Sequence, residues 1–300
     1  MAISRQQRAL LYALGSVLCW STVATAFKLA LRDVGVPALV LYSTLTSALV
    51  LSAIVAASKR RNALRDLTAK DVLLSSIMGL LNPFAYYLVL FRAYDLLPAQ
   101  EAQPLNYTWP IVLSLMAALL LGQKVRGKDA VAMLVSFCGV IVISTRGDVG
   151  GLHFTNPEGV ALAVGSSVIW ASYWILNMRS TIDPVLRLAL NFCAGTVYIA
   201  VFVLLVGADL SASPSGALAA VYIGLFEMGL TFVLWMSALR HARSAATVSN
   251  LVYLSPFLSL LIIATVLGEN IYPSTLIGLV LIVGGILWQQ FGERSGSGAV

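Results

Sequence analysis

The chain has 300 residues, of which 59% are hydrophobic and 11% charged, and a formal net charge of +6 at pH 7. Soluble domains are about 45–50% apolar and about 25% charged, so this composition excludes a water-soluble globule and predicts a protein in a lipid bilayer. The net positive charge is explained by the loops of such a protein, and it gives no reason to expect a nucleic-acid partner.

Ten long apolar stretches follow one another along the chain, each close to the roughly 20 residues that cross a bilayer as a helix. Lipid admits only helices or closed barrels, and the alternation typical of strands is absent, so we predict an all-α membrane protein with ten transmembrane helices. The stretches are 9–31, 37–57, 71–92, 98–121, 128–145, 157–178, 185–207, 215–239, 244–267 and 273–291.

Basic residues in the loops predict the orientation. If the N-terminus is cytoplasmic, the cytoplasmic segments hold 15 Lys and Arg residues and the external loops hold 3, which is the bias expected of a plasma-membrane protein with both termini inside. The cytoplasmic set is Arg5, Arg8, Lys59, Arg60, Arg61, Arg65, Lys70, Lys124, Arg126, Lys128, Arg179, Arg187, Arg240, Arg243 and Arg294. The external set is Arg32, Arg92 and Arg146, and Lys28 lies within the first stretch.

The two halves of the chain repeat each other. Ala13-Leu14-Gly15-Ser16 and Trp20 recur as Ala163-Val164-Gly165-Ser166 and Trp170, at an offset of 150. A second set of matches has an offset of 146 and pairs Tyr107 with Tyr253, Pro110 with Pro256, Leu121-Gly122 with Leu267-Gly268, and Gly139 with Gly285. Two widely spaced sets at nearly one offset indicate a duplicated unit of the kind that many transporters carry.

We therefore predict two five-helix repeats, residues 1–146 and 147–300, that form one compact membrane domain. Because five is odd, the second repeat enters the membrane from the opposite side, and the two repeats are inverted. Inverted-repeat transporters usually bind substrate near the membrane midplane, so we expect a central cavity that opens to each side in turn.

Pro110 and Pro256 lie in the fourth helix of each repeat, and Leu267-Gly268-Glu269 closes the second of these helices. With ten helices in two inverted repeats, the chain resembles the EamA-type members of the drug/metabolite transporter superfamily. The first repeat has Leu121-Gly122-Gln123, with Gln where the family often has Glu. The whole chain is also similar to the YddG-type aromatic amino-acid exporters. The resemblance implies export of aromatic and other neutral amino acids across a bacterial inner membrane.

Aromatic and polar residues inside the stretches are the candidates for lining the cavity. Trp20 and Trp170 lie mid-span at equivalent positions of the repeats, whereas Trp235 lies near a span end, where interfacial Trp is common. In the sixth stretch a polar and aromatic stripe with helical spacing begins at Ser166. The predicted cavity residues are Trp20, Asn82, Tyr86, Gln103, Tyr107, Trp109, Ser166, Trp170, Tyr173, Trp174, Asn177, Glu227, Thr231 and Tyr253.

Two interpretations of these residues remain open, a lining that binds substrate and simple packing between helices. Prolines support the first, because a proline inside a helix removes a backbone hydrogen bond, and paired interruptions in the two halves are typical of transport sites. The predicted helix breaks are at Pro83, Pro104, Pro110 and Pro256. A kink that only shapes the helix bundle is the alternative for each.

Glu227 lies near the centre of the eighth stretch, where an ionised acid costs at least about 2.5–3.5 kcal/mol on insertion scales. It is either a polar or proton-binding group of the cavity or a neutral structural acid. Glu101, near the end of the fourth stretch, is expected to face water.

Rival functions lack their usual residues. The chain has no H-E-x-x-H or G-x-S-x-G motif and no phosphate-binding glycine loop, so we predict neither an enzyme nor ATP drive. We expect no metal and no cofactor, because the three cysteines lie in separate apolar stretches. The expected partners are amino-acid substrates and membrane lipids. An exporter of drugs or other metabolites is the main alternative, and a channel or lipid scramblase a further one.

Overall fold

The structure is a computed structural model that describes residues 4–121, 127–151, 154, 156–177, 181–242 and 250–294. All of the regular elements within these residues are helices, which confirms the predicted all-α class for the described part of the chain. Some residues named above lie outside the described residues: Gly122, Gln123, Lys124, Arg126, Arg179 and Arg243.

Helices follow one another closely along the chain. The first half contains α1 (Arg5–Ala30), α2 (Val36–Ala56), the 3-10 helix η1 (Lys59–Asp66), α3 (Ala69–Gly79), the π-helix η2 (Leu80–Ala85), α4 (Tyr86–Leu96), α5 (Ala99–Asn106), α6 (Trp109–Leu121) and α7 (Gly127–Ser144). The second half contains α8 (Pro157–Asn177), α9 (Pro184–Val206), α10 (Pro214–Phe226), α11 (Leu230–His241), the 3-10 helix η3 (Asn250–Leu254), α13 (Ser255–Ile262), the π-helix η4 (Ile263–Leu267) and α14 (Pro273–Arg294).

Helix starts follow from local sequence. Ser4 accepts a hydrogen bond from the Gln7 amide and begins α1, and Thr68 caps α3 through the Asp71 amide in the same way. Asp183 caps α9, which begins at Pro184, a position where the missing amide proton costs nothing. These caps place the starts of the helices close to the starts of the apolar stretches.

Six segments are long and apolar enough to cross a membrane among the described residues. They are Arg5–Ala30, Val36–Ala56, Ala69–Leu96, Pro157–Asn177, Pro184–Val206 and Pro214–His241. Shorter apolar helices cover Ala130–Ser144, Leu251–Leu267 and Pro273–Trp288. The chain is thus a multi-pass membrane protein, and the count of ten helices stays a prediction.

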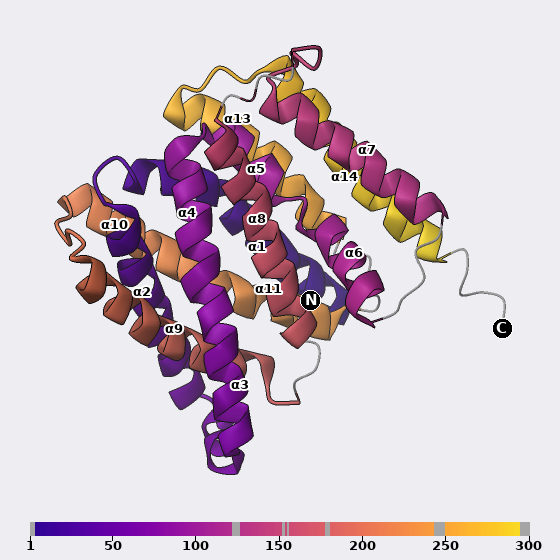
Figure 1. Cartoon of the computed structure of the whole chain (residues 1–300). Helices are drawn as coiled ribbons and strands as arrows, with labels where there is room; N and C mark the ends of the chain where they lie inside the picture. The colour runs from indigo at the N-terminus through magenta and orange to yellow at the C-terminus, as the bar shows by residue number, and fades with distance from the viewer. Residues whose placement is uncertain are drawn as a thin grey trace. The chain divides into compact units, whose positions relative to one another are not determined.

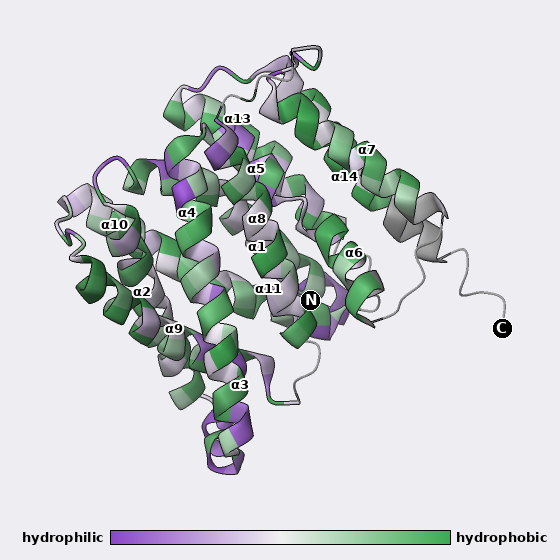
Figure 2. Ribbon diagram, in the orientation of Figure 1, coloured by the Kyte–Doolittle hydropathy of each residue, from purple (hydrophilic) through white to green (hydrophobic). Residues whose placement is uncertain are grey.

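Hydrophobic side chains on the outside of the helices fit a lipid environment. Leu204 and Leu205 on α9, for example, are each 80% exposed. Figure 2 shows hydrophobic residues along most helices and hydrophilic residues gathered at η1. Such apolar exposure is unfavourable in water and costs nothing against lipid tails, so it supports the membrane assignment.

The described chain packs into two compact units. The first consists of Met1–Phe91 and Ser180–Gly268, and the second of Arg92–Arg179 and Glu269–Val300. In the first unit α2 packs along α9, and α1 packs against α10, α11 and α13. In the second unit α7 packs along α14, and α5 and α6 pack against α8 (Figure 1).

Each unit therefore draws helices from both halves of the sequence. The predicted boundary between residues 146 and 147 concerns the sequence repeat rather than packing, and it stays a prediction.

Within the first unit the break in the third apolar segment packs closely on α9. A Cβ added to Gly195 would lie 2.5 Å from Cδ and Cγ of Pro83, so only glycine permits this approach.

Candidate functional site

The first unit contains two membrane-length segments that are interrupted at their midpoints. Asn82 is the fourteenth residue of Ala69–Leu96, and Glu227 is the fourteenth residue of Pro214–His241, each segment being 28 residues long. Asn82 has the non-helical angles φ −141° and ψ 115°. Three residues, Glu227 to Gly229, separate α10 from α11. Both breaks therefore fall at the midpoints of segments that are long enough to cross the hydrocarbon layer.

Polar atoms at these two breaks are buried with few partners. The Tyr87 hydroxyl donates to Glu227 Oε1 at 3.2 Å, whereas Glu227 Oε2 has no hydrogen-bond partner among the described residues. Asn82 is fully buried, and neither atom of its amide has a partner in the described part of the chain. Most buried polar groups in proteins are satisfied, so unsatisfied groups at two equivalent positions need an explanation.

Aromatic side chains of the first unit pack around Trp20 on α1. Its ring lies 5.3 Å from the ring of Trp235 and 6.0 Å from the ring of Phe232, both on α11. Trp235, which the sequence places near a span end, is buried against Trp20 within the unit, and its position at the membrane interface stays a prediction. Trp20 itself is only half-buried and keeps part of its indole exposed.

The remaining predicted residues of the first unit are buried near the same elements. Tyr86 packs on Tyr87 with the ring centroids 4.8 Å apart, and Tyr253 in η3 is buried. Thr231, in the first turn of α11, donates its hydroxyl to the Phe226 carbonyl, which joins the end of α10 to the start of α11. Thr231 therefore bridges the break beside Glu227.

The second unit holds the aromatic stripe predicted on α8. Trp170 stacks on Tyr173 at 5.6 Å, and Trp174 meets Trp170 edge-on at 6.1 Å. The stripe begins at Ser166, which accepts a 2.8 Å hydrogen bond from Asn106 at the end of α5. Trp174 Nε1 is a buried donor with no acceptor among the described residues.

The other predicted residues of the second unit lie on α5 and α6 and at the end of α8. Gln103 is buried, and its Oε1 has no partner in the described part of the chain. Tyr107 and Trp109 flank the junction between α5 and α6 and are half-buried, as is Asn177, the last residue of α8. The contact of Asn106 with Ser166 was not predicted, because Asn106 matches nothing at either repeat offset.

The predicted cavity residues are thus divided between the units, six in the first and eight in the second. The first unit holds Trp20, Asn82, Tyr86, Glu227, Thr231 and Tyr253, and the second holds Gln103, Tyr107, Trp109, Ser166, Trp170, Tyr173, Trp174 and Asn177. That both sets line one cavity stays a prediction.

The four prolines predicted to break helices occupy two kinds of position. Pro83 lies inside η2, and Pro104 lies inside α5. Pro110 and Pro256 instead occupy the second position of α6 and of α13. A proline there needs no hydrogen-bond partner for its nitrogen, so these two begin a new helix after a break and do not interrupt one.

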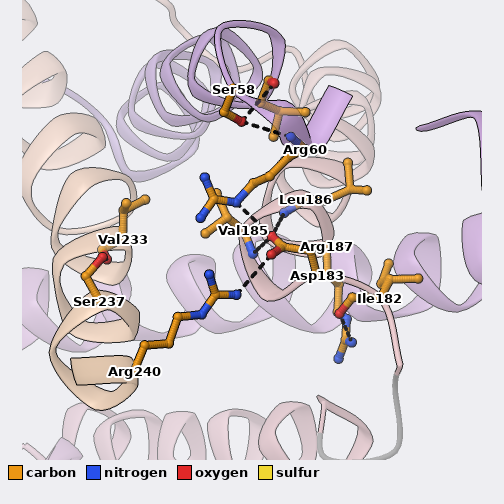
Figure 3. A network of polar contacts seen from close by, with 11 residues as sticks. Ser58, Arg60, Ile182, Asp183, Val185, Leu186, Arg187, Val233, Ser237 and Arg240 are labelled. Atoms are coloured by element: carbon orange, nitrogen blue, oxygen red, sulfur yellow. Dashed lines mark hydrogen bonds and ion pairs between the residues drawn. The ribbon is translucent and has the colours of Figure 1, made fainter. Parts of the chain in front are cut away.

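A charged network around Asp183 joins η1, α9 and α11 in the first unit (Figure 3). Asp183 Oδ1 accepts from Arg60 Nε at 3.1 Å, and Asp183 Oδ2 accepts from Arg240 Nη2 at 3.0 Å. Arg5 donates to the Arg240 carbonyl at 2.8 Å. The N-termini of α1 and α9, η1 and the C-terminus of α11 therefore lie together, as expected of segments predicted to share one face of the membrane.

The ionisation of Asp183 is set by this network. Partial burial disfavours the charged carboxylate, but the hydrogen bonds from Arg240 and from the Leu186 and Val185 amides, with the charge of Arg60, together lower the pKa of Asp183 below its ordinary value of 3.8. Asp183 is therefore ionised at neutral pH, and it caps α9 and binds two guanidinium groups at once.

The expectation that Glu101 faces water is wrong. Glu101 is fully buried, and its Oε1 accepts from Arg146 Nε at 2.7 Å. The Arg146 guanidinium also lies 4.8 Å above the ring of Tyr272. The short loop after α7 brings Arg146 over the start of α5, which the sequence pattern did not indicate.

The comparison with known families decides the class of protein. The model of the EamA-like transporter family matches residues 7–145 and again residues 157–289. The chain belongs to the EamA-like transporter family. The two matches agree with the two-repeat membrane fold expected of an EamA-like transporter, and they cover most of each half of the chain.

Curated relatives of this EamA-like transporter are named as transporters. The aromatic amino acid exporter YddG of Ancylobacter novellus is 27% identical over 214 residues, which is 70% of this chain and 73% of that protein. The probable terminal-alkyne amino-acid exporter of Streptantibioticus cattleyicolor is 28% identical over 277 residues, 91% of this chain and 90% of that one. The uncharacterized inner membrane transporter YhbE of Escherichia coli is 23% identical, with 95% and 92% covered.

A solved crystal structure also resembles this EamA-like transporter, with a TM-score of 0.67 and 24% identity over 96% of this chain and 98% of that one. This likeness concerns the fold alone. The family match makes the chain a membrane transporter.

Proposed function

We propose that this transporter exports aromatic and other neutral amino acids across the bacterial inner membrane by alternating access. Its ten helices form two inverted repeats around a central cavity, and both termini are cytoplasmic. The transported molecule is a small zwitterion with an apolar side chain, bound by aromatic rings and by a few hydrogen-bonding groups.

The observation that carries this proposal is the pair of midpoint breaks with buried, incompletely bonded polar groups. Inverted-repeat transporters place substrate groups at interrupted helices near the midplane, where backbone and side-chain polar atoms are available. Asn82 and Glu227 occupy such positions in corresponding helices of the two repeats. Buried polar atoms without a partner are costly, so those at the two breaks are available to a bound molecule.

The aromatic character of the substrate is supported by two further facts. Each unit has a ring cluster near predicted cavity residues, around Trp20 in the first and Trp170 in the second. A stacked aromatic substrate gains about 0.5–1.5 kcal/mol per good ring pair beyond its burial. One of the relatives is named as an exporter of aromatic amino acids, and another as a probable exporter of terminal-alkyne amino acids.

Counterflow in proteoliposomes tests the proposal. Purified protein is reconstituted with unlabelled phenylalanine inside, and uptake of labelled phenylalanine is measured in competition with each of the twenty amino acids. Trp20→Ala and Trp170→Ala are expected to raise the half-saturation concentration about 2- to 10-fold, which is the loss of one ring pair. Trp288→Ala is the control, because Trp288 is 60% exposed on α14 and belongs to neither ring cluster.

The same assay separates the alternative functions. An exporter of drugs or other metabolites exchanges none of the twenty amino acids but saturates with another labelled compound. A channel or scramblase passes label without saturation or counterflow, and an enzyme releases a changed compound. Any of these results would replace the proposed function.

A further inference from the structure

Only one of the two carboxyl oxygens of Glu227 has a hydrogen-bond partner among the described residues. Its Oε1 accepts the Tyr87 hydroxyl at 3.2 Å, which fixes the orientation of the group. Its Oε2 is buried and has no partner among the described residues of either unit. A buried acid is normally paired or fully hydrogen-bonded, so a free oxygen at mid-membrane is a candidate position for a donor group of a ligand.

The atoms around the break beside Glu227 are also acceptors. A Cβ added to Gly229 would lie 2.9 Å from the Gly224 carbonyl oxygen, 3.2 Å from the Leu225 carbonyl oxygen and 3.5 Å from Ser47 Oγ. Ser47 Oγ on α2 is buried as well and has no partner in the described part of the chain. Oxygen atoms from α2 and α10 therefore gather around Gly229, two residues after Glu227 in the same break.

The charge of a ligand at this position follows from these groups. Glu227 forms no ion pair with the described residues 4–91, 181–242 and 250–268 of the first unit, whereas Arg60 and Arg240 both pair with Asp183. A carboxylate surrounded by acceptors repels an anion and attracts a cation that brings several N–H donors. A primary ammonium group, with three donors on one nitrogen, fits this set of acceptors.

We propose that Glu227 Oε2 binds the α-ammonium group of the transported amino acid. Tyr87 holds the carboxyl in place through Oε1, and Ser47 Oγ is a second acceptor near the same break. The proposal rests on the proposed function and deepens it, because it makes Glu227 the residue that distinguishes an amino acid from a molecule of the same shape that has no amine. When the ammonium group is bound, Glu227 Oε2 has a hydrogen-bond partner.

Competition between matched compounds tests this role. Labelled phenylalanine counterflow is inhibited by unlabelled phenylalanine or by 3-phenylpropionate, which keeps the ring and the carboxylate but lacks the amine. We expect the wild-type protein to need at least 10-fold more 3-phenylpropionate than phenylalanine for half inhibition. In Glu227→Gln this ratio is expected to fall below about 3-fold, because phenylalanine loses its charged partner.

Control variants separate recognition from folding. Glu158→Gln, on an exposed side chain in the first turn of α8, is expected to keep the wild-type ratio. Glu227→Asp keeps the charge and is expected to restore part of the discrimination. Thermal unfolding of purified protein supplies a second readout, since phenylalanine should raise the midpoint temperature of the wild type and not that of Glu227→Gln.

An unchanged inhibition ratio in Glu227→Gln overturns the proposal. If that variant also loses the dependence of transport on a pH gradient, Glu227 is a proton site instead. Failure of the proposed function looks different, because the wild-type protein itself then shows no counterflow of any amino acid. That result removes both proposals, whereas a change confined to the variants concerns Glu227 alone.

Discussion

Single residues carry the strongest link between the sequence repeat and the structure. Asn82 and Glu227 are 145 residues apart, close to the repeat offset of 146, and the structure places both at midpoint breaks. Ser47 and Asn106 were missed, because a lone Ser or Asn in an apolar stretch has no sequence signal that distinguishes it from a residue bonded to its own helix. Glu101 was misjudged, since its partner Arg146 lies 45 residues away.

The Glu101–Arg146 pair gives a prediction at this scale. Arg146→Ala leaves the fully buried Glu101 carboxylate without its partner, and we expect a loss of about 2–4 kcal/mol in the free energy of unfolding. This is somewhat less than for a fully buried pair, because Arg146 is 39% exposed. Thermal and denaturant unfolding of the purified protein in detergent measure the effect.

The double variant Glu101→Gln with Arg146→Ala is the control for that pair. It removes the unpaired charge, so it should be more stable than Arg146→Ala alone. Equal stability of the single and double variants would contradict a role for the ion pair and leave only the packing of Arg146 on Tyr272.

At the scale of the elements, two aspartates at helix starts make contacts between the two sequence repeats. Asp33 and Asp183 lie at the same offset of 150 as the first repeat match, just before α2 and α9. Asp183 binds Arg60 and Arg240, whereas Asp33 accepts from the hydroxyls of Ser213 and Ser215. Each aspartate thus ties the start of one repeat's second helix to a loop or helix end of the other repeat, once with charges and once with neutral donors.

Substitutions of Asp183 test the charged version of this contact. Asp183→Asn keeps an N-cap acceptor for α9 but loses both ion pairs, and we expect a cost of about 0.5–1 kcal/mol because the groups are partly exposed. Asp183→Ala also removes the cap and should cost about 1 kcal/mol more. Unfolding midpoints of the two variants, compared with the wild type, give both values.

The pH dependence of the same comparison has a definite sign. The folded-state pKa of Asp183 is lowered, so its ionic contribution is fully present above the unfolded value of 3.8 and is lost as the pH falls through the lower folded value. The stability difference between wild type and Asp183→Asn should be constant at neutral pH and shrink below about pH 4. A difference that grows on acidification would contradict the assignment.

At the scale of the whole molecule, the loop charges and the contacts agree within the first unit. Arg60 and Arg240, both predicted to be cytoplasmic, meet at one aspartate, and Arg5 joins them. The orientation of the molecule in the membrane rests on the bias of basic residues alone.

Labelling of single cysteines tests this topology. With Cys19, Cys138 and Cys193 replaced by Ser, Lys59→Cys and Arg240→Cys should react with a membrane-impermeant maleimide only after cells are opened. Asp209→Cys, in an exposed loop predicted to be external, should react in intact cells. Reaction of Lys59→Cys and Arg240→Cys from opposite sides would end the inverted-repeat interpretation.

The sequence by itself determined the class of the fold and its duplication. Hydropathy and periodicity are local properties, and the penalty for an unbonded backbone in lipid makes each apolar stretch a helix whatever surrounds it. Only the tertiary structure decided how polar atoms are satisfied, because their partners are distant in the chain. Tyr87 and Glu227 are 140 residues apart, and Arg60 and Asp183 are 123 apart. The free oxygen of Glu227 and the buried Glu101 are consequences of such contacts, which no local pattern specifies.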